Sequence, residues 1–270
     1  MLIVLSLLRK KRSPINIFRR DRIRTEILSN GKIEVLNIRY EAFHKNISIT
    51  RLSRLCDGLS DTVLCPGYII PDKAPVMRFC DNSLQLILME NFLLSVLSSL
   101  PQSKIKICLC DPFARFYELA ERLLETIPEI TVATRMPHFY SCRAAAAKGS
   151  MNITDDPSSL PECDIIIHPE PVSSTLPGCR FIFSAYEPLI NDKRIIYRYL
   201  SDIPEEYRGL IPPGTDPQYF LCALYSLERQ KKLAQAVPPA ALGMDGAMTK
   251  EYITGISEAL LSTSKGKPQA

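Results

Sequence analysis

The side chain best suited to acid–base chemistry in this sequence is a histidine that follows a run of isoleucines. His168 ends the segment Asp164-Ile-Ile-Ile-His168, and Glu170 follows two residues later. An imidazole titrates near neutral pH, so it can exchange a proton with a bound molecule, and with Glu170 it could form a polar site. The alternative is a histidine that is hydrogen-bonded within a loop and has no chemical role.

The segments around His168 alternate between apolar strands and helices. Strand patterns lie at 104–110, 130–134, 164–168, 180–184 and 194–200, and helix patterns lie at 113–126, 142–148 and 216–228. Alternation of this kind is typical of βαβ units. We therefore predict an α/β fold with a parallel sheet beginning at Lys104. His168 would then lie at the carboxyl edge of the sheet, where α/β proteins have their sites.

The loop after the first of these strands lacks the glycines of a dinucleotide-binding loop. The chain has no glycine between Gly67 and Gly149, and residues 111–115 read Asp-Pro-Phe-Ala-Arg. Glycines at this place allow a tight turn and a close approach of the backbone to a pyrophosphate. Asp111 adds a negative charge where the pyrophosphate would sit, and Pro112 removes an N–H group. The sequence thus indicates a Rossmann-like fold and argues against its usual cofactor chemistry.

Three segments, in order along the chain, resemble the cofactor domain of the shikimate dehydrogenase family. Residues 129–135 (Glu-Ile-Thr-Val-Ala-Thr-Arg) resemble that family's strand ending in Asn-Arg-Thr. Residues 164–171 (Asp-Ile-Ile-Ile-His-Pro-Glu-Pro) resemble its Asp-Ile/Leu-Ile-Ile-Asn-Ala-Thr-Pro, and residues 183–188 (Phe-Ser-Ala-Tyr-Glu-Pro) resemble its Asp-x-x-Tyr-x-Pro. The resemblance covers residues 81–228 and implies a degenerate, Rossmann-like member of that family.

The resemblance implies a cofactor site formed by Asp111, Thr134, Arg135, Pro169 and Tyr186. After the second strand of such a sheet, an acidic residue favours NAD, whereas a basic residue accommodates the 2′-phosphate of NADP. Thr134 and Arg135 are the NADP-like choice. The alternative for Arg135 is an exposed loop cation without a ligand.

The resemblance also implies an acid–base pair for hydride transfer, which this chain matches only in part. The family's catalytic lysine follows an Ile-Pro-x sequence, and Lys73 follows Ile-Pro-Asp here. The family's acid, in Asn-Thr-Asp, falls on Leu84. Asp81 is the nearest carboxylate, but capping the helix that follows is its simpler role.

The first hundred residues are predicted to form a smaller α+β domain. Alternating segments 22–28 and 32–38 are joined by Asn30-Gly31, which predicts a hairpin with a type I′ turn, and a long apolar helix begins near Asp81. The predicted organisation is a basic arm over 1–21, an α+β domain over 22–100 ending in an inter-domain helix, a Rossmann-like domain with a C-terminal helix over 101–235, and a mostly disordered tail over 236–270.

Positive charge is concentrated near the N-terminus. Residues 9–24 contain eight Lys or Arg and one Asp, in a chain whose net charge is +4. This segment could contact an anionic membrane surface, or it could be a solvated terminus after one apolar strand. The apolar run before it is far shorter than the roughly 20 residues that span a bilayer. No aromatic residues alternate with the basic ones, so nucleic acid is not a predicted partner.

The nine cysteines contain no Cys-x-x-Cys pair and no metal-ligand spacing. We interpret them as free thiols, mostly buried, which favours a reducing, cytoplasmic compartment and no metal.

Together these features predict a non-catalytic, Rossmann-like binding or regulatory protein, a pseudoenzyme with no bound cofactor. Its partner would be an unknown small molecule or protein. Two alternatives stay open: an NADP-dependent oxidoreductase with an atypical cofactor loop, and a membrane-peripheral module held by residues 9–24.

Overall fold

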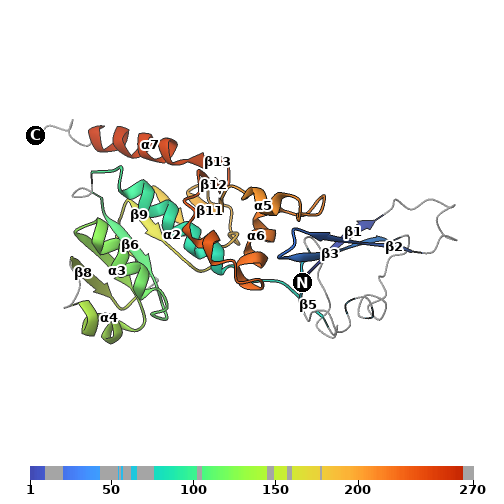
Figure 1. Cartoon of the computed structure of the whole chain (residues 1–270). Helices are drawn as coiled ribbons and strands as arrows, with labels where there is room; N and C mark the ends of the chain where they lie inside the picture. Colours follow the sequence, from blue (N-terminus) through green and yellow to red (C-terminus); the bar gives the residue numbers. More distant parts are fainter. Residues whose placement is uncertain are drawn as a thin grey trace, which may run out of the picture. The chain divides into compact units, whose positions relative to one another are not determined.

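The structure is a computed structural model that describes residues 1–9, 21–42, 54, 56, 62–65, 76–101, 105–144, 149–156, 160–176 and 178–263. Contacts between residues divide the chain into two compact units. The first unit comprises Met1–Leu84 and Ile203–Ala234, and the second comprises Gln85–Asp202 and Gln235–Ala270. Figure 1 shows the elements of both units in the colours of the sequence.

An eight-stranded sheet forms the centre of the second unit, with the strand order β13-β12-β11-β10-β9-β6-β7-β8. Its strands are β6 (Ile107–Cys110), β7 (Glu129–Ala133), β8 (Ser150–Thr154), β9 (Ile165–Ile167), β10 (Phe181–Phe183), β11 (Ile195–Leu200), β12 (Ala240–Gly243) and β13 (Gly246–Thr249). Strands β6 to β11 are parallel, whereas β12 and β13 are antiparallel. If the six parallel strands are numbered by their order along the chain, they lie side by side as 3-2-1-4-5-6 from β8 to β11. This is the Rossmann order.

The predicted α/β fold with a Rossmann-like parallel sheet is therefore confirmed. The segments predicted to pair, 104–110 and 164–168, contain β6 and β9, and Ile107 lies opposite Ile165 in a parallel register. Strand β6 begins at Ile107, and the predicted start at Lys104 lies outside the described residues. Every residue of β6, β9 and β10 is buried, as expected for parallel strands whose two faces are both covered.

Four helices belong wholly or largely to the second unit: α2 (Ser83–Leu97), α3 (Tyr117–Thr126), α4 (Pro137–Ala144) and α7 (Lys250–Thr263). The start of α2 just after Asp81 confirms the predicted helix. Phe92 of α2 packs against Phe183 of β10 and Tyr199 of β11, with ring centroids 6.4 Å and 5.7 Å apart. Helix α4 begins earlier than the predicted segment 142–148, because Pro137 starts its first turn.

Strand β11 contains an irregularity that α2 compensates. The register with β12 shifts between Tyr197 and Tyr199, and Arg198 between them has a φ of 52°. The buried side-chain amide of Gln85 accepts a hydrogen bond from the Tyr199 N–H at 2.7 Å and donates one to its carbonyl at 3.3 Å. Backbone groups that the bulge removes from the ladder are thereby satisfied.

The predicted disordered tail over 236–270 is wrong for the part that the structure describes. Residues 240–249 form the hairpin of β12 and β13, which extends the sheet, and α7 follows directly. Ala241 and Gly243 are buried between their neighbours, so the small residues that suggested disorder are core residues of a strand. Strand β13 begins directly after the two-residue turn with Gly246, which has a φ of 126°, a conformation that favours glycine.

The first unit is built on a three-stranded sheet in the order β1-β3-β2. Strand β1 (Leu2–Arg9) is parallel to β3 (Glu34–Ala42), and β2 (Arg22–Ser29) is antiparallel to β3. The other elements of this unit are β4 (Thr62–Val63), β5 (Met77–Arg78), α5 (Glu205–Arg208), α6 (Pro217–Ser226) and a 3-10 turn, η3 (Lys231–Gln235), at its end. Residues 2–5 are buried, so the start of the predicted basic arm is a core strand, because its apolar run pairs with β3 in the sheet.

Two local predictions in this unit have different outcomes. The hairpin between β2 and β3 exists, but its turn is not type I′. Four residues (30–33) connect the strands. Gly31 has a positive φ, of 82°, but Asn30 does not. A type I′ turn needs a positive φ at both of its central residues. The cap of α6 is as predicted: the Asp216 side chain accepts a hydrogen bond from the Tyr219 N–H at 3.0 Å.

Candidate functional site

The carboxyl ends of four adjacent strands gather most of the predicted site residues at one edge of the second unit. Strands β7, β6, β9 and β10 are neighbours in this order. The chain leaves β6 for β7 on one side and reaches β9 on the other, so the switch point of the sheet lies between β6 and β9. The residues that directly follow these strands are Asp111, Thr134, His168 and Ser184. In an open α/β sheet, this is where a ligand crevice is expected.

Asp111 is fully buried, and its carboxyl group accepts three hydrogen bonds from within the chain. The Arg115 N–H donates to Oδ1 at 2.9 Å and the Phe116 N–H donates to Oδ2 at 2.8 Å. The Tyr140 hydroxyl, from α4, also donates to Oδ2. The expectation that this carboxylate faces the pyrophosphate space is therefore corrected: Asp111 turns inward, where the loop and α4 supply its partners.

The 111–116 loop adopts a shape that a glycine-rich loop would adopt more easily. Ala114 has a φ of 54°, which costs of order 1 kcal/mol for a residue with a Cβ. Its N–H donates to the Asp111 carbonyl at 3.4 Å. The hydrogen bonds to the Asp111 side chain thus hold a loop conformation that its sequence does not favour.

Arg115 connects the loop after β6 to the loop after β9. Its guanidinium lies 3.5 Å from the Glu170 carboxylate and 5.2 Å from the centroid of the Phe113 ring. Two-thirds of the Arg115 side chain is exposed, so the ion pair contributes at most about 1 kcal/mol. It nevertheless places a charged pair across the switch point.

Thr134 and Arg135 follow β7, but Thr134 does not face solvent. Thr134 is fully buried, and its hydroxyl accepts a hydrogen bond from the Met136 N–H at 3.0 Å, just before α4 begins. Arg135 is exposed, and its N–H donates to the Pro112 carbonyl at 3.2 Å. Thr134 therefore orders the start of α4, whereas the Arg135 guanidinium is accessible to a ligand.

His168 lies in a hydrogen-bonded loop at the end of β9. Its Nδ1 lies 2.9 Å from the Glu170 carbonyl. A carbonyl oxygen only accepts, so Nδ1 donates and Nε2 is the accepting nitrogen of the neutral ring. The buried Ser184 hydroxyl lies 3.1 Å from the same carbonyl, as donor. The loop alternative for His168 thus has a structural basis, and Nε2 keeps the capacity to accept a proton.

Pro169 and Tyr186 lie beside this loop. Pro169 is buried and Tyr186 is partly buried. The Tyr186 N–H donates to the Ser184 hydroxyl oxygen at 3.3 Å. Both residues follow strands at the carboxyl edge, as the resemblance implied, and their role in binding stays a prediction.

The implied acid–base pair cannot be assembled from the described residues. Lys73 lies outside them, and Leu84 is buried. The Asp81 carboxylate accepts a hydrogen bond from the Ser83 N–H at 2.7 Å, at the start of α2. Burial opposes its ionisation, but hydrogen bonds from Ser226 and Ser83 outweigh it and lower the pKa of Asp81 below its ordinary value. The Asp81 carboxylate thus accepts a hydrogen bond from the first N–H of α2, and its role as a cap stays a prediction.

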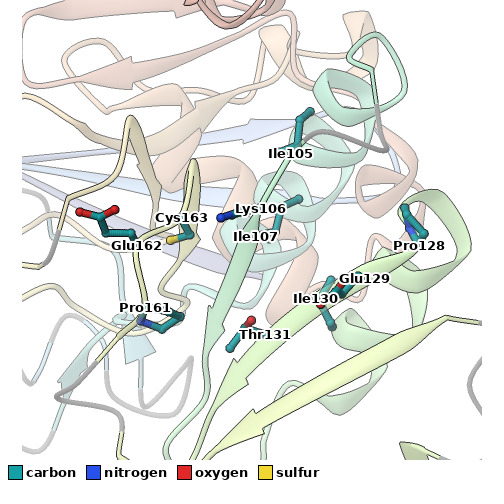
Figure 2. Close-up of a pocket in the computed structure, with 10 residues that line it drawn as sticks. All are labelled: Ile105, Lys106, Ile107, Pro128, Glu129, Ile130, Thr131, Pro161, Glu162 and Cys163. Carbon is teal, nitrogen blue, oxygen red and sulfur yellow. The ribbon is translucent and has the colours of Figure 1, made fainter. Parts of the chain in front are cut away.

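A cavity of about 370 Å³ lies at the opposite, amino edge of the sheet. Its walls come from the residues before and at the starts of β6, β7 and β9, namely 105–107, 128–131 and 161–163 (Figure 2). Isoleucine and proline side chains form much of the wall, and burial raises the pKa of the Cys163 thiol to about 12. No pattern in the sequence pointed to this cavity.

Tyr140, which completes the buried hydrogen-bond cluster around Asp111, was not predicted from the sequence. The only available signal was an aromatic residue in a segment of weak helical character. Burial, together with the hydrogen bond and the negative charge of Asp111, raises the pKa of the Tyr140 hydroxyl well above the ordinary 10.0. The ring also packs against Tyr117 of α3, with centroids 5.6 Å apart.

Replacing Tyr140 by phenylalanine should lower the free energy of unfolding by about 1.5–3 kcal/mol at neutral pH, because a hydrogen bond to a charged group is lost. The raised folded pKa means that this stabilisation is complete below pH 10.0 and declines above it. The difference between wild type and Tyr140→Phe, measured by urea unfolding, should therefore stay constant up to about pH 9 and shrink as the pH rises above 10.0. A difference that is absent at pH 7 would contradict this role.

Three further predictions concern membranes and metals. Most of the basic segment 9–24 lies outside the described residues; Arg22 and Arg24 are exposed on β2, and a membrane role stays a prediction. In the portion of the chain that the structure describes, no helix is long and apolar enough to cross a bilayer. Within the same portion, no cluster of three His, Cys, Asp or Glu side chains could hold a metal ion.

Comparison with known proteins adds little beyond the fold. No model of a protein family matches the chain, and no curated protein matches its sequence. Among solved structures, it is similar to L-tryptophan dehydrogenase from Nostoc punctiforme, with 10% identity and a TM-score of 0.39. The match covers 85% of this chain and 70% of that chain. The fold belongs to the broad Rossmann-like class, and a match this weak says nothing about activity or substrate.

Proposed function

We propose that this chain is a non-catalytic, Rossmann-like binding or regulatory protein that does not use the dinucleotide-binding mode of dehydrogenases. The observation that carries the proposal is the set of three hydrogen bonds that the buried Asp111 carboxylate accepts from within the chain. The N–H groups at the start of the first helix after β6 are the groups on which a Rossmann domain places the pyrophosphate. Here the N–H groups of Arg115 and Phe116 donate to Asp111 instead.

Electrostatics support the same proposal. A pyrophosphate that replaced these interactions would approach a buried carboxylate. Two unit charges ~4 Å apart at a surface-like dielectric repel by about 4 kcal/mol. Moving the carboxylate away would instead leave the buried Tyr140 hydroxyl without its acceptor. The repulsion alone removes about half of the free energy that a micromolar cofactor complex needs, about 8 kcal/mol.

The residues around the loop support a ligand of another kind. Arg135, Arg115 and the Nε2 atom of His168 stand on the loops at the carboxyl edge, and Arg135 and Arg115 are exposed. Such groups suit a small molecule or a protein segment that does not carry a pyrophosphate. Three segments resemble the shikimate dehydrogenase family and occur in the same order along the chain. Their order supports a common ancestry with that family, which is part of the proposal.

One observation favours a second candidate, an NADP-dependent oxidoreductase with an atypical loop. The Arg135 side chain is exposed directly after β7, the place at which a basic residue accommodates the NADP 2′-phosphate. An exposed ion pair contributes only about 0–1 kcal/mol. Arg135 alone therefore does not replace a lost pyrophosphate site.

Calorimetric titration of the full chain with NADPH and NADH distinguishes the two candidates. We expect no saturable heat at ligand concentrations up to about 1 mM, which corresponds to about 4 kcal/mol of binding free energy or less. Arg135→Ala, which leaves the loop intact, is the matched variant. Micromolar NADPH binding that disappears in Arg135→Ala, or reduction of NADP in the presence of shikimate, would favour the oxidoreductase instead.

A further inference from the structure

The outer strand of the sheet in the first unit is an open, regular edge. Strand β1 at the other edge is engaged: the Leu5 N–H donates to the Leu64 carbonyl, and the Leu64 N–H donates to the Ile3 carbonyl, both at 2.8 Å. Strand β2 pairs with β3 over all of Arg22–Ser29 without a register shift. Within the described parts of the chain, no further strand pairs with β2.

Strand β2 lacks several of the features that protect a sheet edge, although it carries charged side chains. It contains neither proline nor glycine and no bulge, and it is longer than the average strand of about 5–6 residues. Its residues 24–27 are all exposed, and the Ile27 side chain is 66% accessible. A long, regular edge of this kind is a template for pairing with another strand.

The side chains of β2 sort onto two different faces. One face of the strand carries every second side chain, namely Arg22, Arg24, Glu26 and Leu28. On this face, Glu26 lies 3.6 Å from Arg39 of β3. On the other face, Ile23 packs against the apolar core cluster of this unit, and Thr25 and Ile27 continue the same row. A partner strand must match both faces at once.

Charge on β2 is unevenly compensated within one copy of the chain. Arg24 lies directly opposite Arg39 in the register with β3. Like charges opposite each other destabilise a strand pair. Glu26 lies opposite Asn37 and contacts Arg39. Among the described residues, Arg24 forms no ion pair of its own, so a carboxylate on its outer side would stabilise the edge.

We propose that β2 pairs with β2 of a second copy of this chain, antiparallel, with Thr25 facing Thr25 of that copy. Residues opposite each other in an antiparallel pair share the same hydrogen-bonding type, so a symmetric pair is centred on one residue. Centring on Thr25 places each Arg24 opposite a Glu26, and each Ile23 opposite an Ile27.

The neighbouring registers are unfavourable. Centring the pair on Arg24 places two guanidinium groups opposite each other, and centring it on Glu26 places two carboxylates opposite each other. Within one copy, Arg24 lies opposite Arg39. In the Thr25 register, the carboxylate of Glu26 from the second copy lies opposite Arg24 on its other side. The pattern of the strand is therefore complementary to itself, which favours a second copy over an unrelated extended peptide.

Sedimentation velocity of the full chain over about a hundredfold range of concentration tests the proposal, because a dimer dissociates on dilution. Wild type should form a dimer. The single variants Arg24→Glu and Glu26→Arg should each raise the dissociation constant at least about tenfold, because both charge pairs become repulsive. Both substituted side chains are exposed, so the circular dichroism spectra should stay close to that of wild type.

A double variant and a mixture of the two single variants distinguish loss of this interface from loss of folding. The double variant Arg24→Glu/Glu26→Arg restores both opposite-charge pairs and should dimerise like wild type. An equimolar mixture of the two single variants should form a heterodimer, because one strand carries two carboxylates and the other two guanidinium groups. A monomeric wild type at the highest concentration, single variants that dimerise like wild type, or a mixture that stays monomeric would each overturn the proposal.

Discussion

Replacing Asp111 by alanine should lower the free energy of unfolding by about 3–5 kcal/mol. The carboxylate accepts hydrogen bonds from two backbone N–H groups and from the buried Tyr140 hydroxyl. A hydrogen bond to a charged group contributes about 1.5–3 kcal/mol, and buried donors that lose their acceptor add a desolvation cost. Urea unfolding monitored by circular dichroism measures the change, provided that the slope with denaturant stays constant.

Asp111→Asn is the matched control for this prediction. Its amide keeps one oxygen as an acceptor and nearly the same volume, so we expect about half the loss seen with alanine. A loss below about 1 kcal/mol in Asp111→Ala would mean that water or a rearranged loop satisfies the same donors. The anion site at the start of α3 would then not depend on Asp111, and the proposed function would lose its main support.

Replacing Phe92 by alanine should also cost about 3–5 kcal/mol, the range for buried phenylalanines that leave a cavity. Phe92 is fully buried, and its ring contacts those of Phe183 and Tyr199, so it fixes α2 on strands β10 and β11. Thermal unfolding with a concentration-matched wild type measures the change in midpoint.

Phe113→Ala is the control at an exposed position, where 48% of the residue is accessible. We expect it to change the free energy of unfolding by less than about 1 kcal/mol. Equal effects at Phe92 and Phe113 would contradict the packing of α2 onto the sheet. A small effect at Phe92 alone would indicate that the core collapses around the cavity.

The parallel sheet could be predicted from the sequence because its strands carry a strong local signal. Ile165–Ile167 and Phe181–Phe183 are continuous apolar runs, as buried parallel strands require. The helix at Pro217 was equally predictable, because an aspartate followed by a proline is a local N-terminal signal. In both cases, the residues that determine the element lie within it.

The end of the sheet was missed because composition outweighed a local signal. Residues 236–270 are rich in small residues, which suggested disorder. Asp245-Gly246 between short apolar segments is a hairpin signal, and it marks the turn from β12 to β13. Pairing of β12 with β11 depends on a strand some forty residues earlier in the chain, and propensity alone does not encode such long-range pairing.

The role of Asp111 could not be inferred from its immediate neighbours. Its sequence position suggested a carboxylate facing a ligand. Its actual orientation depends on Tyr140, which lies in another helix 29 residues away, and on Ala114 adopting a positive φ. A satisfied buried carboxylate is a tertiary property, so it becomes visible only once α3 and α4 are placed against the same strands.

The backbone N–H groups of Arg115 and Phe116 report most directly on the central claim, that their hydrogen bonds to Asp111 keep them from binding a pyrophosphate. Their amide signals can be followed by nuclear magnetic resonance during a titration of the full chain with NADPH, with inorganic pyrophosphate as a second probe. If the hydrogen bonds to Asp111 persist, both signals should keep their positions up to about 1 mM ligand, the limit of weak binding. Saturable shifts of both signals at micromolar NADPH would show that the phosphates displace Asp111, and would contradict the account.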